Sequence, residues 1–414
     1  GFVTANLAIL FVALFAMGLH STLFGPVKYA IMPQALAQDE LVGGNALVES
    51  GTFVAILVGT IAGGVLVAVK PSGPVIVAVA TIVLAVIGYL VSRAIPAAPA
   101  TDPSLKLNWN PFTETASNLR LAAQNIVVWR SMLGISWLWF YGAMLLNQFA
   151  NMSKDVLGGN AEVATALLAI FAVGVAVGSL MCERLSGKKV EIGLVPFGSI
   201  GMSVFAIDLY FATKGLHPVG QTGALEFIKN PDHWRVVADL FLLSVSGGLY
   251  SVPLYALIQE RSDASHRSRI IAANNILNAI FMVVSALLAI VLIKFAGFNV
   301  PQLILTIGIL NALVAAYIYT LTPEFLLRFL CWMLISFVYR LRVKGLENIP
   351  DKGPVIIVAN HVSYVDALVI LAACRRPVQF VMDHNIFRTP VLGWAFRQMK
   401  AIPIASAKED PEMM

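Results

Sequence analysis

The sequence is poor in charged residues and in cysteine. Only 12% of its 414 residues are Asp, Glu, Lys or Arg, whereas soluble domains usually contain about a quarter. Together with 58% hydrophobic residues, this scarcity excludes an ordinary soluble enzyme and a disordered chain. Cys182, Cys331 and Cys374 lie far apart and form no C-x-x-C pair. They therefore provide neither a disulfide framework nor a thiolate metal site.

The few charges present lie in short clusters between apolar runs. The net charge is +5, but this distribution is typical of membrane topology and not of a DNA-binding surface. We therefore expect no nucleic-acid partner. The chain begins with Gly1 and shows no signal peptide, and we interpret this start as an N-terminal truncation.

Long apolar runs account for most of the chain. A helix needs about 20 apolar residues to cross roughly 30 Å of hydrocarbon. Small residues four apart within the runs, as at Gly174 and Gly178 or in the stretch 59–64, predict close packing between helices. About nine runs of spanning length are present, near residues 5–24, 50–69, 74–93, 131–150, 161–182, 190–213, 235–257, 270–294 and 301–320.

The loops predict an orientation. Lys and Arg gather in the loops 183–191 and 259–269, whereas the turn at 296–300 carries no charge. Cytoplasmic loops are enriched in Lys and Arg. Alternation of the spans then places both basic loops, the connector 94–130 and everything after residue 321 in the cytoplasm.

Two parts of the chain resemble each other at an offset of about 230 residues. Residues 25–31 follow the first span, and residues 251–258 end the seventh. An asparagine-bearing helix start comes about twenty residues after each, at 43–49 and at 272–278. Such similarity is typical of transporters built from two parallel six-helix halves, the alternative being chance similarity of apolar segments. Three spans precede the second copy but not the first, so the sequence predicts nine of twelve helices.

Residues 1–325 resemble the C-terminal three-quarters of a major facilitator transporter. Residues 25–31 (Gly-Pro-Val-Lys-Tyr-Ala-Ile) and 45–49 (Asn-Ala-Leu-Val-Glu) are similar to the bacterial lysophospholipid transporter family. The resemblance implies a lysophospholipid substrate and contact with membrane lipid.

Polar residues within the spans are the transport candidates, because burying them in lipid is costly. Each has an alternative role at an interfacial helix end or in an interhelical hydrogen bond. We select Lys28 and Glu49 as an ion pair that gates the cytoplasmic face, with Asn45 and Asn275 as further candidates. The polar residues of the spans are Lys28, Glu49, Asn147, Gln148, Asp208, Asp239, Asn274, Asn275, Asn278 and Asn311.

The pattern changes after residue 322. Residues 325–339 are apolar but short for a crossing, and Arg340, Arg342 and Lys344 follow them. A helix that lies in the membrane interface, or a re-entrant helix, is predicted here. The β-branched run 355–358 predicts a buried strand.

His361 and Asp366 follow the predicted strand. On one helix they would lie about 140° apart and could not meet. They can meet if His361 lies on the loop and Asp366 in the first turn of a helix that starts near Ser363. His361 would then act as a general base, with Asp366 fixing its tautomer. Each residue also has a non-catalytic alternative. Residues 363–366 match a capping box, S-x-x-D, in which Asp366 caps the helix, and His361 could be an ordinary loop histidine with its hydrogen bonds satisfied.

The run 343–366 resembles the start of the glycerolipid acyltransferase family, whose first block is N-H-x-x-x-x-D after a G-P-hydrophobic strand. Asn360, His361 and Asp366 match this block. The resemblance implies acyl transfer from a thioester to the hydroxyl of a lysophospholipid, with His361 and Asp366 catalytic and Asn360 at the substrate. It implies acyl-CoA or acyl carrier protein as donor, the latter also a partner, with no bound cofactor and no metal.

The chain departs from this family pattern near its end. Lys408 is the only basic residue where the second block usually carries an arginine, and we assign it to substrate binding. The third block, of E-G-x-R type, is absent because the sequence stops at Met414. The acyltransferase domain is therefore predicted to be incomplete.

Both parts together resemble a bacterial fusion of a lysophospholipid transporter with a 2-acylglycerophosphoethanolamine-type acyltransferase. The predicted fold is an α-helical membrane protein of the inner membrane, with a major facilitator-type bundle at 1–322. An interfacial helix and linker follow at 323–345, and 346–414 begin a cytoplasmic α/β acyltransferase domain. Two alternatives stay open: a transporter with an inactive acyltransferase remnant, and an acyltransferase that its helices only anchor.

Overall fold

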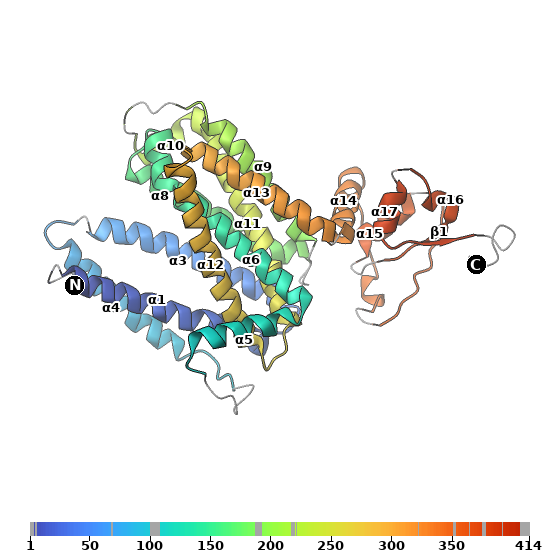
Figure 1. Ribbon diagram of the computed structural model, residues 1–414, viewed down its shortest axis with the longest axis horizontal. Helices are drawn as coiled ribbons and strands as arrows, with labels where there is room; N and C mark the ends of the chain where they lie inside the picture. Colours follow the sequence, from blue (N-terminus) through green and yellow to red (C-terminus); the bar gives the residue numbers. More distant parts are fainter. Residues whose placement is uncertain are drawn as a thin grey trace. The chain divides into compact units, whose positions relative to one another are not determined.

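The computed structural model is mainly helical, with a small sheet near the C-terminus (Figure 1). The chain divides into two compact units, Gly1–Ala312 and Leu313–Met414, with the division inside one helix. The described residues are 4, 6–67, 69–99, 108–186, 193–216, 220, 222–321, 323–350, 353–363, 365–374, 378–390 and 392–405.

Long helices make up the first unit. Among the described residues, eight helices are long and apolar enough to cross a membrane. The helices are α1 (Leu7–Ala30), α2 (Met32–Ala35), α3 (Leu41–Val67), α4 (Gly73–Ser92), α5 (Pro111–Ala123), α6 (Ile126–Leu146), α7 (Phe149–Asn151), the π-helical turn η1 (Met152–Val156), α8 (Ala161–Ser186), α9 (Leu194–Thr213), α10 (Ala224–Lys229), the 3-10 turn η2 (Pro231–His233), α11 (Trp234–Arg261), α12 (Arg267–Lys294) and α13 (Val300–Leu321).

All nine predicted spans fall on helices. The span predicted at 131–150 corresponds to α6, which has 21 residues but is not among the eight. Its three tryptophans and Arg130 lower its hydropathy without shortening it. Helix α3 begins at Leu41 and not at residue 50, so the segment 43–49 is already helical.

Helix α11 is the central element of the first unit. It packs against α9, α8, α6 and α3, and most of its residues are buried (Figure 1). Helix α12 packs against α6, α1 and α5. The two helices that carry the similar segments, α1 and α11, each contain an internal proline, Pro26 and Pro253.

Small residues allow α8 to approach α11 closely, as predicted for Gly174 and Gly178. A Cβ on Gly178 would overlap the carbonyl oxygen of Val245, and one on Gly248 would lie 2.5 Å from that of Val175. Within the described residues, the same prediction is not met at Gly59 and its neighbours at 63 and 64, because a Cβ there would meet no atom of another element within 4 Å.

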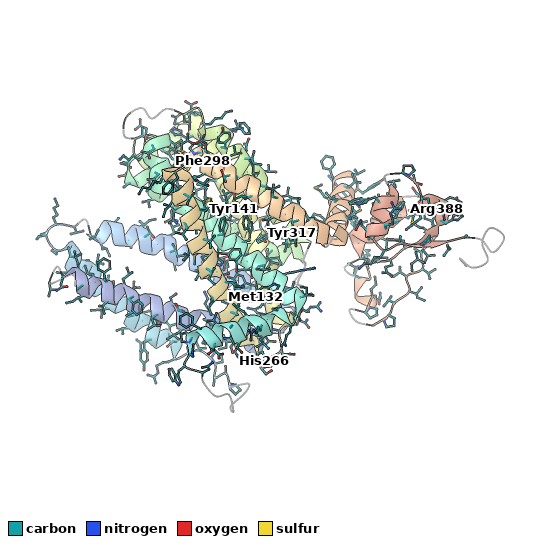
Figure 2. The ribbon with its side chains drawn as sticks, viewed as in Figure 1. Met132, Tyr141, His266, Phe298, Tyr317 and Arg388 are labelled. Atoms are coloured by element: carbon teal, nitrogen blue, oxygen red, sulfur yellow. The ribbon has the colours of Figure 1, made fainter. Side chains whose placement is uncertain are left out.

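The interior of the first unit is mainly apolar, and its outer faces are apolar too. Met132 and Tyr141 of α6 are almost fully buried, and the Tyr141 hydroxyl donates to the Met202 carbonyl at 3.0 Å (Figure 2). By contrast, Phe15 of α1 is 74% exposed and Leu84 of α4 is 68% exposed. Exposed apolar side chains of this kind can contact lipid tails, which are apolar as well.

The second unit contains short elements around a two-stranded parallel sheet. In its register, Val381 pairs with Ile402 and Asp383 with Ile404. Helix α14 packs against α15 and α17. The elements are α14 (Pro323–Val338), the 3-10 turn η3 (Leu346–Asn348), α15 (Val365–Ala373), β1 (Val381–Asp383), α16 (His384–Phe387), α17 (Leu392–Gln398) and β2 (Ile402–Ile404).

Helix α14 has 16 residues, or about 24 Å, which is shorter than the hydrocarbon core of a bilayer. Its length thus agrees with the expectation of a helix too short to cross. Its position in the membrane interface stays a prediction.

The predicted buried strand at 355–358 is wrong. These residues form no strand, and Ile356 and Val358 are 90% and 88% exposed. A strand is stabilised by the backbone hydrogen bonds of a neighbouring strand. The sheet of the described residues pairs β1 with β2 and offers 355–358 no such partner.

Candidate functional site

The side chains of His361 and Asp366 lie in contact at the start of α15. Nδ1 of His361 is 3.2 Å from Oδ2 of Asp366. His361 lies on the irregular segment before the helix, and Asp366 is the second residue of α15, as the spacing argument required. The His361 side chain is 70% exposed. No hydrogen bond to its other ring nitrogen, Nε2, is present within the described part of the chain.

The same carboxylate also orders the loop. Oδ2 of Asp366 accepts hydrogen bonds from the backbone N–H groups of Val362 and Ser363, at 2.7 and 2.8 Å. The Ser363 hydroxyl oxygen accepts from the N–H of Val365 at 3.3 Å. The capping arrangement and the contact with His361 are therefore present together and are not alternatives.

These contacts stabilise the ionised form of Asp366. The N–H groups of Ser363 and Val362, and then the neighbouring His361, hold the pKa of the Asp366 carboxyl below its ordinary value. A carboxylate at this position favours a proton on Nδ1 of His361 and leaves Nε2 as the basic nitrogen. The arrangement can therefore accept a proton from a hydroxyl group placed at Nε2.

Two residues were predicted to bind substrate beside this pair. Asn360 is exposed and directly precedes His361. Lys408 lies outside the described residues. Both assignments stay predictions.

In the first unit, Tyr29 is the hydrogen-bond partner of Glu49. The Tyr29 hydroxyl donates to Oε2 of the buried Glu49 at 3.1 Å. Nζ of Lys28 donates to the Thr52 hydroxyl at 3.3 Å and lies 4.7 Å from the centroid of the Tyr29 ring. The direct ion pair predicted between Lys28 and Glu49 does not form in the described structure. Lys28 reaches instead to the residue that lies almost one turn after Glu49 on α3.

An amide pair joins α3 to α11 next to this cluster. Asn45 Nδ2 donates to Gln259 Oε1 at 2.6 Å, and Gln259 Nε2 donates to Asn45 Oδ1 at 3.1 Å. Gln259 Nε2 also donates to the Tyr29 carbonyl at 3.2 Å. Tyr29 stacks on Tyr255 of α11. The predicted transport residue Asn45 is thus a structural link among α1, α3 and α11.

Asn275 packs against α1. A Cβ on Gly25 would lie 2.9 Å from Nδ2 of Asn275, so the glycine admits the amide group. The cluster thus unites Lys28, Glu49 and Asn45 through Tyr29 and Gln259, while Asn275 contacts the same helix, α1.

Sequence reasoning missed the residues that connect this cluster. Gln259 was assigned to a basic loop, but it lies in the last turn of α11 and is 1% exposed. Tyr29 and Tyr255 carried a signal, because each belongs to one of the two similar segments. Nothing in the sequence distinguished Thr52, since a hydroxyl group in an apolar helix is common.

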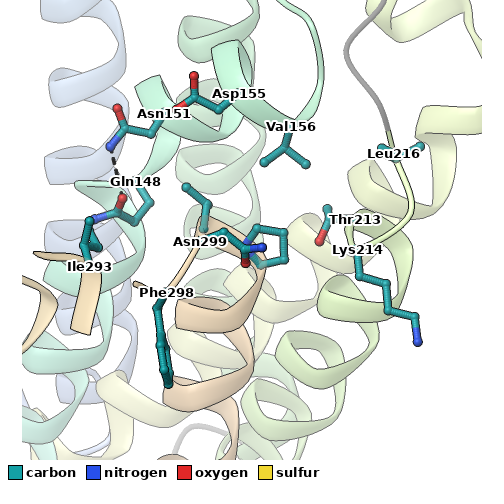
Figure 3. Close-up of a pocket in the computed structure, with 12 residues that line it drawn as sticks. Gln148, Asn151, Asp155, Val156, Thr213, Lys214, Leu216, Ile293, Phe298 and Asn299 are labelled. Atoms are coloured by element: carbon teal, nitrogen blue, oxygen red, sulfur yellow. Dashed lines mark hydrogen bonds between the residues drawn. The ribbon is translucent and has the colours of Figure 1, made fainter. Parts of the chain in front are cut away.

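A separate polar cavity lies near other helix ends of the first unit (Figure 3). It measures about 370 Å³ and is lined among others by Gln148, Asp155, Lys214 and Asn299. The amide of Asn151 donates to that of Gln148 at 3.2 Å across one side of it. Gln148, one of the polar span residues, therefore faces a space and not a packed helix.

Two protein-family models match the chain. The Major Facilitator Superfamily model matches residues 1–228, and an Acyltransferase model matches residues 340–414. No solved structure matches the chain.

Curated relatives match the membrane part. The lysophospholipid transporter LplT of Enterobacter sp. (strain 638) is 28% identical over 260 residues, which cover 61% of this chain and 58% of that protein. The protein of the same name from Serratia proteamaculans is 27% identical over 259 residues, 60% of this chain and 58% of its own. That of Klebsiella pneumoniae is 30% identical over 259 residues, 62% and 59% of the two chains.

The chain thus spans less than two thirds of the length of these relatives. Its helices and its similarity to them make it a multi-pass membrane protein. The first family model covers more than half of the sequence. The chain therefore belongs to the Major Facilitator Superfamily, and it carries a C-terminal acyltransferase domain.

Proposed function

We propose that the membrane part transports a lysophospholipid and that the C-terminal domain reacylates it. The similarity to proteins named lysophospholipid transporters supports the first half of the proposal. The contact of His361 with Asp366, inside the segment that matches the Acyltransferase model, carries the second half.

The proposed chemistry is a direct acyl transfer. The free glycerol hydroxyl attacks the carbonyl carbon of a thioester, and Nε2 of His361 accepts the hydroxyl proton. A C–O ester bond forms, the C–S bond breaks, and the leaving thiolate takes up the proton. Asp366 stabilises the transient imidazolium through Nδ1. Acyl-CoA or acyl carrier protein supplies the thioester, and Asn360 and Lys408 bind the substrate.

The proposed organisation places transport and acylation in one chain of a bacterial inner membrane. Residues 1–322 form the transporter, 323–345 an interfacial helix and linker, and 346–414 the start of the acyltransferase domain. Basic loops support a cytoplasmic location for this domain. Fusion then raises the local concentration of the transported lipid at the acylating site.

Within the transporter, we assign gating to the cluster that contains Lys28, Glu49 and Asn45. Buried polar groups in a membrane are costly and mark substrate paths. Here they bridge α1 and α3 to α11. We place Asn275 on the same path because it packs against α1 beside them.

A second candidate is a transporter whose C-terminal segment does not catalyse acylation. The exposed, unpaired run 355–358 favours it, because this run directly precedes Asn360 and His361. A flexible run would hold the general base less firmly.

Reconstituted vesicles test the proposal. The full-length protein is inserted in liposomes, a labelled lysophosphatidylethanolamine is supplied on one side, and acyl-CoA or acylated carrier protein is supplied on the other. Labelled diacyl lipid is the expected product. Lipid uptake without product would favour the second candidate. Product formed only when donor and lipid share a side would indicate an anchored enzyme, and the absence of both would overturn the proposal.

A further inference from the structure

The polar cavity at the helix ends carries two opposite charges that the transport proposal does not use. It measures about 370 Å³, and both Asp155 of η1 and Lys214, the residue after α9, line it (Figure 3). Neither side chain forms an ion pair within the described residues. The Lys214 ammonium group lies instead 4.6 Å from the ring centroid of Phe211. The cavity therefore presents one positive and one negative group to a ligand.

Neutral amide groups line the same cavity. The Gln148 side chain is 5% exposed, and its Oε1 accepts a hydrogen bond from Asn151 Nδ2 at 3.2 Å. Within the described structure, Gln148 Nε2 and Asn299 Nδ2 donate no hydrogen bond to the protein. A buried amide donor without an acceptor costs free energy. A ligand with several oxygen atoms would remove this cost.

Two walls of the cavity favour a negatively charged ligand group at a defined place. One wall includes Val300 and Pro301, the first two residues of α13. The N-terminus of a long helix carries a partial positive charge, which adds to that of Lys214. Another wall comes from the π-helical turn η1, which carries Asp155. Turns of this kind occur frequently at functional sites.

An apolar edge connects the cavity to the lipid-facing surface. Ile293, near the end of α12, lines the cavity and is 41% exposed, and Phe298 of the following loop lines it as well. Ile290, one turn earlier on the same helix, is 53% exposed. An acyl chain can stay against this surface while a polar head group occupies the cavity. A lipid uses both features, whereas a small soluble ligand uses only the polar one.

The cavity and the cluster that contains Tyr29 lie at opposite ends of the first unit. Arg235, in the first turn of α11, donates to Asp208 of α9, shortly before Thr213, which lines the cavity. Gln259, in the last turn of α11, belongs to the other cluster. The 28 residues of α11 span about 42 Å. Because the basic loops predict the cytoplasm at the end of Gln259, the cavity belongs to the outer face.

From this arrangement we propose that the cavity binds the zwitterionic head group of a lysophospholipid, a glycerophosphoethanolamine group, at the outer face. Lys214 and the start of α13 bind the phosphate, and Asp155 binds the ammonium group. The amides of Gln148 and Asn299 donate to the remaining oxygen atoms. A head group without an ammonium group gains nothing from Asp155. This inference rests on the proposed transport function and adds a head-group site to it.

Equilibrium dialysis of the full-length protein in detergent, with labelled glycerophosphoethanolamine, tests the site without using transport. This probe has no acyl chain, so it does not partition into detergent. The wild type should bind it saturably, and Lys214→Gln and Asp155→Asn should each weaken binding several-fold. Both side chains are exposed, so these variants should fold. Absence of saturable binding by the wild type, or equal binding by the wild type and both variants, would overturn the proposal.

Matched controls separate the site from the net charge of this face. Lys229→Gln and Asp232→Asn remove exposed charges of α10 and η2 that do not line the cavity, and both should bind the probe as the wild type does. Losses in these controls as large as those in Lys214→Gln and Asp155→Asn would show a general charge effect and overturn the proposal.

Competing ligands identify the group that is bound. Unlabelled glycerophosphoglycerol, which lacks the ammonium group, should displace the probe from the wild type less well than unlabelled glycerophosphoethanolamine does. Asp155→Asn should remove this difference. Displacement by inorganic phosphate as effective as that by glycerophosphoethanolamine would show a phosphate site only and would overturn the head-group assignment.

Uptake of labelled lysophosphatidylethanolamine into vesicles connects the site with transport. Lys214→Gln should raise the KM of uptake several-fold with little change in the maximal rate, because the residue acts in binding. An unchanged KM would overturn the assignment of the cavity to transport. Head-group binding without lipid uptake by any variant, the wild type included, counts against the proposed transport function and not against the site.

Discussion

Tyr29 of α1 and Tyr255 of α11 stack face to face, with ring centroids 4.7 Å apart and ring planes within 1° of parallel. Each tyrosine belongs to one of the two segments that resemble each other in sequence. Their hydroxyl groups have different partners: that of Tyr29 donates to Glu49, and that of Tyr255 accepts from the Trp139 indole at 3.3 Å. The stacked rings therefore connect the hydrogen bond between Tyr29 and Glu49 with the hydrogen bond between Trp139 and Tyr255.

Replacement of Tyr255 should separate the ring contact from the hydroxyl contact. Tyr255→Phe keeps the stacked ring and loses one long hydrogen bond. Tyr255→Leu also loses the ring and should be less stable than Tyr255→Phe by about 0.5–1.5 kcal/mol, the usual strength of an aromatic pair. Thermal unfolding in detergent measures the difference. Equal stabilities of the two variants would show that the stack contributes nothing.

In the full-length protein, His361→Ala should strongly slow acyl transfer and leave lipid uptake intact. A positioned general base usually accelerates proton transfer by about 10²–10⁴-fold, and the loss in kcat should fall in this range. The assay is formation of diacyl lipid from lysophospholipid and a thioester donor. His384→Ala, which removes another histidine of the same domain, is the matched control. Unchanged acylation in His361→Ala would remove the general-base assignment.

The stability of the first turn of α15 should depend on pH because of the Asp366 carboxyl group. The N–H groups of Ser363 and Val362, with His361, lower the pKa of this carboxyl group, so the folded chain binds the proton less well than the unfolded chain does. The stabilisation is therefore complete above the ordinary carboxyl pKa and is lost as the pH falls through the lowered one. The protection of the Val362 and Ser363 amides, measured as their exchange rate relative to that of an unstructured peptide at the same pH, should therefore fall on acidification.

Asp383 offers a matched comparison for this pH effect. Its carboxylate accepts from the N–H groups of Asn385 and Ile386 at the start of α16. Asp383→Ala, which removes the accepting oxygen, should therefore accelerate exchange at α16 only, and Asp366→Ala at α15 only. Faster exchange at both helices in either variant would indicate general unfolding and not the loss of one cap.

Sequence length and composition were sufficient to predict the spans, because each helix in a membrane must satisfy its own backbone hydrogen bonds. They could not identify the partners of polar side chains, which depend on which helices become neighbours. Glu49 illustrates this limit: a nearby lysine suggested an ion pair, but the hydroxyl of Tyr29 is the partner. Gln259 was missed because α11 continues beyond the apolar run that predicted it.

The second unit shows where local patterns succeed and fail. His361 and Asp366 could be predicted to meet because a loop followed by a helix start requires only neighbouring residues. The strand at 355–358 could not be predicted reliably, since a strand forms only when another strand pairs with it. The β-branched residues of this segment favour a strand, but no strand in the described part of the chain pairs with it.

Two glycine substitutions should separate helix contact from helix propensity. Gly178→Ala places a Cβ against the carbonyl oxygen of Val245, on a backbone that cannot move without shifting α11. Such overpacking usually costs about 1–3 kcal/mol. Gly59→Ala introduces the same methyl group where no atom of another element in the described structure lies within 4 Å, so only the higher helix propensity of alanine remains.

Thermal unfolding of both variants in the same detergent tests this contrast. Gly178→Ala should unfold at a lower temperature than the wild type, and Gly59→Ala at the same or a higher temperature. Because both changes add one methyl group to a long apolar helix, their difference isolates the contact between α8 and α11. A Gly178→Ala protein as stable as Gly59→Ala would mean that α8 and α11 can separate without loss, and α11 would then not be the fixed centre of the first unit.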